Sequence, residues 1–174
     1  MRDGTEEEYV DYVTARIPAL RRLAYLLAGD EHRADDLVQQ TITTLFVKWQ
    51  RARKADHLDR YVRTMLVHTF LDERRLAWAR VRLFRDTPEP LPVEHAGVED
   101  RQVVRAALAR VPRRQQAVLV LRFFYDLPVD EVAVMLDCSS GTIKSQTSRG
   151  LATLRRLLGE QELAGYSTHG LRSR

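Results

Sequence analysis

Apolar positions in the first 85 residues recur at intervals of three and four, which is the spacing of one face of an α-helix. One series is especially regular and consists of Ala34, Leu37, Val38, Thr41, Leu45 and Trp49. An earlier series stops before Gly29 and Asp30, residue types that punctuate helices. A third begins at Val62, after a charged stretch over 51–59 that has no periodicity. The pattern therefore predicts helices separated by two breaks.

The pattern changes between residues 85 and 100. The segment DTPEPLPVEHAGVED holds three of the six prolines of the chain. Each proline fixes its own φ and disfavours the helical region for its predecessor, so an extended segment is predicted. We expect a linker over 86–99 between two domains, 1–85 and 100–159. Its acidity fits a solvated spacer and also fits a segment that occupies a channel made for nucleic acid.

After the linker, apolar spacing predicts four helical segments within about 60 residues. Pro112 suits a position just inside the second of them. A short third helix is expected over 129–136, followed by a tight turn from Asp137 to Ser139 and a long last helix. Glycines are frequent and apolar residues rare from Gly159 onward, which predicts a flexible tail over 160–174.

Composition adds a fold class and several exclusions. Apolar residues make up 44% and charged residues 30%, as in globular proteins. No apolar run approaches the roughly 20 residues that cross a bilayer, so we expect no membrane insertion and a cytoplasmic location. Cys138 is the single cysteine, which leaves no disulfide framework and no CxxC pair for a metal. The prediction is an all-α protein of two small helical domains joined by a proline-containing linker, without cofactor or metal.

Positive charge is concentrated in the C-terminal part. Residues 100–174 carry 12 basic and 7 acidic side chains, while the whole chain has a net charge of +4. Between Cys138 and Gly159 there is no acidic residue. Such an excess favours a polyanionic partner, although solubility alone would also account for it.

The third helix, the turn and the last helix have the spacing of a helix-turn-helix, whose second helix enters the DNA major groove. Ser139 or Ser140 is expected to cap that second helix. Winding it at 100° per residue gives a buried stripe made of Ile143, Thr147, Gly150, Leu151, Leu154 and Leu158. The other side carries hydroxyl and basic residues suited to base edges and phosphates: Thr142, Lys144, Ser145, Ser148 and Arg149. The alternative is a basic solvated helix that caps a small bundle.

Two separated segments resemble a known family. LPVDEVAVMLDCSSGTIKSQTSRGLATLRRLL resembles the promoter-binding region four of bacterial sigma factors. AGDEHRADDLVQQTITTLFVKW resembles their polymerase-binding region two. Both segments together, with a proline-bearing linker between them, resemble the small extracytoplasmic-function (ECF) group. The resemblance covers roughly residues 16–158. It implies a non-enzymatic factor that binds core RNA polymerase and promoter DNA and directs transcription initiation. An anti-sigma factor is a further candidate partner, for which the sequence contains no separate motif.

The resemblance also assigns roles to residues. Domain 1–85 would bind core polymerase and read and melt the minus-10 element, and domain 100–159 would read the minus-35 element. Core polymerase would contact one face of the second helix, through Asp35, Asp36, Gln39 and Gln40. Minus-10 DNA would contact Tyr61, His68, Arg74, Arg75 and Trp78. Minus-35 DNA would contact Thr142, Lys144, Ser145, Ser148 and Arg149.

Each assignment has a plainer alternative. The outer face of the second helix is also what any solvated helix presents, and Tyr61 and Trp78 are also suited to packing in the core. His68 stands where the family usually has Asn, and an imidazole cannot make the two-point contact of an amide. Gln146 stands where Arg is common, which removes or relocates a phosphate contact.

Two other functional classes compete. A free-standing helix-turn-helix regulator, with an N-terminal sensing or dimerisation domain, would bind a symmetric site as a dimer. An enzyme would use a set such as His68 with Asp72, or His57 with Asp59, for metal or acid-base chemistry. Nothing else in the sequence completes such a set, because HExxH and Gly-rich phosphate-loop patterns are missing.

Overall fold

The structure, a computed structural model, describes the backbone of residues 3–81 and 99–169 and the side chains of residues 4–73 and 101–160. The chain separates into two compact units, Met1–Thr87 and Pro88–Arg174. In the described ranges every regular element is helical and there is no β-strand, which confirms the predicted all-α class. The expected linker lies outside the described residues except for Glu99, where a helix begins.

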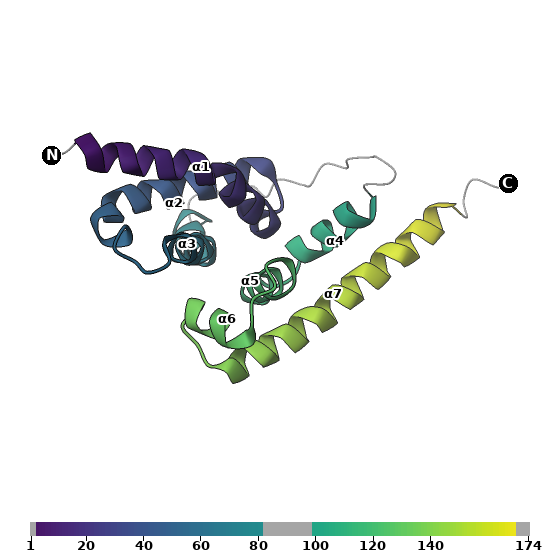
Figure 1. The fold of residues 1–174 in the computed structure, drawn as a ribbon. Helices are drawn as coiled ribbons and strands as arrows, with labels where there is room; N and C mark the ends of the chain where they lie inside the picture. The colour runs from purple at the N-terminus through teal and green to yellow at the C-terminus, as the bar shows by residue number, and fades with distance from the viewer. Residues whose placement is uncertain (1–2, 82–98, 170–174) are drawn as a thin grey trace. The chain divides into compact units, whose positions relative to one another are not determined.

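The N-terminal unit consists of α1 (Asp3–Ala28), α2 (Glu31–Ala52) and α3 (Leu58–Val81), each of which packs against the other two (Figure 1). The apolar stripe of α2 lies in the core as the spacing predicted, and Leu37 and Leu45 are fully buried. Thr41 belongs to the same stripe, and its hydroxyl donates to the carbonyl of Leu37 at 2.7 Å. A polar atom inside this core is therefore satisfied within its own helix.

The break between α1 and α2 has a local cause. Gly29 adopts a left-handed φ of 82°, a conformation that suits the end of a helix and that glycine adopts without steric cost. Asp30 then caps α2, because its carboxylate accepts the backbone N–H of Arg33 at 2.8 Å. The two residue types that predicted the break are thus the ones that make it.

The C-terminal unit contains α4 (Glu99–Ala109), α5 (Arg113–Leu119), a π-helical turn η1 (Val120–Phe124), α6 (Val129–Met135) and α7 (Ser140–His169). Helix α7 contacts α4, α5 and α6 and so forms the spine of the unit (Figure 1). Side chains that are 1% exposed or less form its centre, among them Leu108, Leu121 and Ile143. The helix-turn-helix is therefore seated on a core of its own.

Two details differ from the apolar pattern. The wide turn at η1 is closed by the N–H of Tyr125 and the carbonyl of Val120, five residues earlier, and this shifts the register. Phe123 is an apolar residue of this turn, yet it is 54% exposed. Helix α7 also continues through Gly159 to His169, because one glycine inside a helix costs only about 1 kcal/mol.

Candidate functional site

The outer side of α2 carries a group of exposed polar residues that we call the acid-amide face: Asp36, Gln39, Gln40 and Thr43. They lie opposite the buried stripe, as the winding of an α-helix at 100° per residue requires. Thr43 donates to the carbonyl of Gln39 at 2.7 Å, so its hydroxyl serves its own helix. Within the part of the chain that the structure describes, the side chains of Asp36, Gln39 and Gln40 make no hydrogen bond or ion pair. One carboxylate and two amides therefore remain available to a partner.

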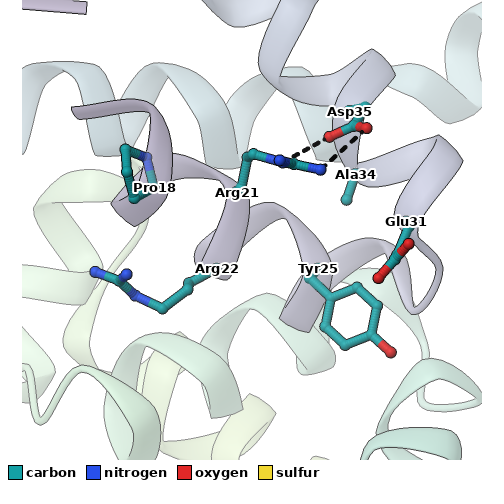
Figure 2. Close-up of a pocket in the computed structure, with 7 residues that line it drawn as sticks. All are labelled: Pro18, Arg21, Arg22, Tyr25, Glu31, Ala34 and Asp35. Carbon is teal, nitrogen blue, oxygen red and sulfur yellow. Dashed lines mark hydrogen bonds and ion pairs between the residues drawn. The ribbon is translucent and has the colours of Figure 1, made fainter. Parts of the chain in front are cut away.

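Asp35 differs from these neighbours because it already has a partner. Arg21 of α1 contacts both of its carboxylate oxygens, with Nε to Oδ1 at 2.8 Å and Nη2 to Oδ2 at 3.3 Å (Figure 2). Both side chains are about half exposed and border a hollow between α1 and α2. Tyr25 and Glu31 also line this hollow. Asp35 thus marks the edge of the acid-amide face and joins α2 to α1.

Helix α3 holds the residues predicted to contact minus-10 DNA. Tyr61 and His68 are half-buried, and seven residues, about two turns, separate them, so they share one face of the helix. The backbone of α3 also includes Arg74, Arg75 and Trp78, whose side chains lie outside the described ones. Tyr61 and His68 thus lie on one face of α3, about two turns apart.

Sequence reasoning missed a set of polar contacts near the start of α3. Side chains of α1 reach the loop between α2 and α3, although they lie more than 40 residues away along the chain. Beneath them, the ring of Trp49 packs against those of Tyr9 and Tyr12, with centroids 5.4 and 5.7 Å apart. Burial raises the pKa of Tyr9 above its ordinary value. No local pattern signals these contacts, because each partner is an ordinary polar residue on a helix surface.

The start of α7 is fixed by hydroxyl groups. Ser139, one of the two predicted caps, accepts the backbone N–H of Thr142 at 3.1 Å. Ser140 serves another purpose, since it donates to the Asp130 carboxylate of α6 at 2.5 Å. In the turn before them, Asp137 adopts a left-handed φ of 50°. The two helices of the motif are therefore joined by a short turn and a side-chain bridge.

The outer side of α7 carries the residues predicted for minus-35 DNA, which we call the recognition face: Thr142, Lys144, Ser145, Ser148 and Arg149. Four of them are exposed, whereas Thr142 is half-buried beside the cap. Gln146 is also half-buried and lies toward the core side of the helix. The predicted buried stripe is right for Ile143 and Gly150, but Leu157 is more buried than the predicted Leu158.

A hollow adjoins the recognition face, between η1, α6 and α7. Three basic residues line it, namely Arg122, Lys144 and Arg155, together with the hydroxyls of Thr147 and Ser148. Arg122 is held in place because its guanidinium donates to the carbonyl of Leu127 at 2.6 Å. Converging cations and hydroxyls match the oxygens of a phosphate diester.

The described residues contain no group of three or more His, Cys, Asp or Glu side chains arranged to hold a metal ion. His57, Asp59, His68 and Asp72 are therefore not brought together as a metal set. Asp59 instead forms an ion pair with Arg16 at 2.7 Å. Among the helices that the structure describes, none combines the length and the apolar character required to span a bilayer.

Two family models match this chain, one in each of its two units. The model "Sigma-70, region 4" matches residues 101–154, which include the helix-turn-helix. The model "Sigma2 domain of PhyR" matches residues 13–60, which include the acid-amide face. The two matches lie in the two units of the chain and agree with the resemblance read from the sequence.

Curated relatives match over nearly the whole chain. The RNA polymerase sigma-E factor of Streptomyces coelicolor is 32% identical over 92% of this chain and 91% of its own length. The ECF RNA polymerase sigma factor EcfG of Rhodopseudomonas palustris is 30% identical over 85% and 83%. Among solved structures, the sigma factor RpoE of Bartonella quintana, in complex with the anti-sigma factor NepR, is 25% identical with a TM-score of 0.69, covering 88% of this chain and 98% of RpoE.

Proposed function

This chain belongs to the extracytoplasmic-function group of RNA polymerase sigma factors, and we propose that it engages core RNA polymerase and promoter DNA through the separate surfaces described above. It directs promoter-specific transcription initiation. Sigma family matches in both units leave a free-standing regulator without support. The proposed roles are core binding and minus-10 recognition for 1–85, with minus-35 recognition for 100–159. We further propose no catalytic activity, since the factor acts by positioning the polymerase.

The acid-amide face carries the proposal for polymerase binding. Asp36, Gln39 and Gln40 project from a rigid, well-packed helix, and no described neighbour satisfies their polar groups. The Asp36 carboxylate can accept hydrogen bonds from an arginine of a partner, and the amide NH2 groups of Gln39 and Gln40 can donate to its carbonyls. The bonds to the charged carboxylate are the stronger ones. Asp35 adds less, because Arg21 already occupies both of its oxygens.

The recognition face carries the proposal for minus-35 DNA. Arg149 and Lys144 can reach base edges or phosphates, and the small Ser145 and Ser148 allow the helix to approach the groove. The hollow with Arg122 and Arg155 would take a backbone phosphate beside that helix. The residues proposed to read bases and those proposed to neutralise phosphates thus lie next to each other on the C-terminal unit.

For minus-10 DNA we propose the face of α3 that includes Tyr61 and His68, together with Arg74, Arg75 and Trp78, which follow them along the chain. Strand separation requires aromatic surfaces for unstacked bases and cations for the freed backbone. Tyr61 and His68 have the partial exposure that lets a ring be both supported by the core and open to a base. An anti-sigma factor, such as the one bound to the relative from Bartonella quintana, would compete for these faces.

The proposal is tested by transcription reconstituted from the full chain, core polymerase and a duplex promoter. Asp36→Ala should weaken binding to core about tenfold, the equivalent of one lost charge-assisted hydrogen bond. Arg149→Ala should keep core binding and lose about tenfold in preference for the minus-35 sequence. The controls are Glu7→Ala and Arg101→Ala, which remove the same charges from exposed positions on α1 and α4. Equal behaviour of all four variants and wild type would refute the assignment.

A further inference from the structure

Three residues of α1 face the loop between α2 and α3. Glu8, Tyr12 and Arg16 are spaced by four, so they lie along one side of the helix. The loop itself, residues 53–57, connects the end of α2 to the start of α3. Glu8 contacts the residue at the first end of this loop, and Tyr12 and Arg16 contact a residue in the first turn of α3, just beyond its second end.

Arg53 marks the first end of the loop, directly after α2. Its Nη2 lies 2.7 Å from Oε2 of Glu8 and 3.0 Å from Oε1, so the carboxylate is held through both oxygens. The other terminal nitrogen of Arg53 donates to the Thr5 hydroxyl at 3.3 Å. Arg53 is about one third exposed, which makes it the more buried member of the pair. The end of α2 is thereby attached to the first turns of α1.

Asp59 lies just beyond the second end of the loop, in the first turn of α3. Tyr12 donates its phenolic proton to Oδ1 at 2.9 Å, and Arg16 contacts Oδ2 at 2.7 Å. Burial raises the pKa of Tyr12, and the hydrogen bond to the Asp59 carboxylate raises it further, so the phenol remains a donor. The Tyr12 ring also rests against Trp49, which fixes its position. Both oxygens of Asp59 are therefore occupied from α1.

Between these two attachments, Lys54, Asp56 and His57 are exposed. The two attachments use opposite charges. Glu8 of α1 pairs with the cationic Arg53, whereas Arg16 and Tyr12 of α1 contact the anionic Asp59. Because Glu8 would repel Asp59 and Arg16 would repel Arg53, the two ends of the loop cannot exchange partners on α1. These attachments fix the distance between the two ends of the loop and the direction in which it enters α3 before any partner binds.

We propose that α1 is a positioning element, which through Glu8, Tyr12 and Arg16 holds the 53–57 loop and the start of α3 in the arrangement that reads the minus-10 sequence. This inference rests on the proposed placement of minus-10 recognition in this unit. A loop and first turn that are ordered in advance hold the α3 face with Tyr61 in place. Less conformational freedom is then lost when that face receives a separated strand, and this gain is larger for the strand that fits. The three residues act through the loop, so they determine selectivity without themselves contacting DNA.

The test uses holoenzyme of the full chain and core polymerase. Wild-type holoenzyme first selects its promoter from a duplex library randomised over the minus-10 and minus-35 windows. Run-off yields are then measured on that promoter, on a minus-10-substituted copy and on a minus-35-substituted copy. The untied variant combines Glu8→Gln, Tyr12→Phe and Arg16→Gln. Glu7→Gln is the matched control, because it makes the same change one residue away at an exposed position.

The untied variant should lower the minus-10 discrimination ratio about fivefold, which corresponds to about 1 kcal/mol for half-exposed ion pairs. The minus-35 ratio and the affinity for core should stay within about twofold of wild type, because those surfaces are on α7 and the acid-amide face. Arg16→Lys keeps the charge and should retain the wild-type ratio, whereas Arg16→Gln should lower it. These two single variants also serve if the untied variant does not assemble.

A purely structural role for these contacts would reduce yield on all templates and leave the ratios unchanged. That result, or an equal fall in both ratios, would overturn the proposal, whether it is seen in the untied variant or, if that variant does not assemble with core, in Arg16→Gln. Failure of the proposed function is recognised separately. In that case wild type itself would select no promoter and would show neither ratio above one.

Discussion

Gly150 of α7 lies directly against Leu119 of α5. A Cβ atom at Gly150 would stand 3.1 Å from both Cγ and Cδ1 of Leu119 and 3.3 Å from Cβ of Gln115. Leu119 is only 2% exposed, so the surrounding core prevents it from moving aside. The absence of a side chain at Gly150 therefore sets how closely the recognition helix approaches its support.

Gly150→Ala should lower the free energy of unfolding of the C-terminal unit by about 1 kcal/mol. The added methyl overpacks the contact with Leu119, and the better helix propensity of alanine offsets only part of that cost. Urea unfolding of the full chain, followed by circular dichroism, measures the change. Gly159→Ala is the control, because nothing lies within 4 Å of its Cβ position, and it should stabilise α7. An equal gain for both variants would contradict the close contact.

Asp36→Ala should weaken binding to core polymerase by more than Asp35→Ala. The Asp36 carboxylate has no described partner, whereas Arg21 engages both oxygens of Asp35. We expect about a tenfold loss for Asp36→Ala and less than about threefold for Asp35→Ala, since a half-exposed ion pair contributes little. Anisotropy of fluorescently labelled protein, titrated with core, gives both affinities. The reverse order would place the contact on the Arg21 side of the face.

Ser139→Ala should destabilise the C-terminal unit by about 1 kcal/mol, because the N–H of Thr142 loses its acceptor. Ser139→Asn keeps a cap and should restore stability and affinity for a minus-35 duplex. Ser139→Asp also caps but brings a negative charge toward phosphate, so stability should recover while affinity falls. Thermal unfolding and a duplex-binding titration separate the two effects. If Asp and Asn bound DNA equally well, the start of α7 would not face DNA.

The stability that Tyr12 contributes should depend on pH. Its pKa is raised in the folded protein, first by burial and then by Asp59, so the neutral phenol is favoured by folding. That contribution is complete below the unfolded pKa of 10.0 and is lost as the pH rises above it. Wild type should exceed Tyr12→Phe by about 1 kcal/mol at neutral pH, and the gap should narrow above pH 10. Chemical unfolding of both proteins across this range measures the gap, and a gap that widens with pH would contradict the raised pKa.

The helices and their breaks follow from the sequence because their causes are local. Apolar spacing of three and four gave the buried stripe of α2, and Gly29 with Asp30 ended one helix and capped the next. The turn from Asp137 to Ser139 and the cap of α7 were predicted in the same way. Winding also placed Asp36 and Arg149 on outer faces, since the buried side of a helix determines its exposed side.

Only the tertiary structure decided which side chains meet. Arg21 and Asp35 are 14 residues apart, and Tyr12 and Asp59 are 47 apart, and each is an ordinary polar residue on its own helix. The π turn at η1 and the contact of Gly150 with Leu119 likewise depend on how helices pack. Helical periodicity tells which way each side chain points from its own helix. It does not tell which neighbouring helix that side chain meets. The angles and distances between helices, which are set by packing of the whole core, supply that information.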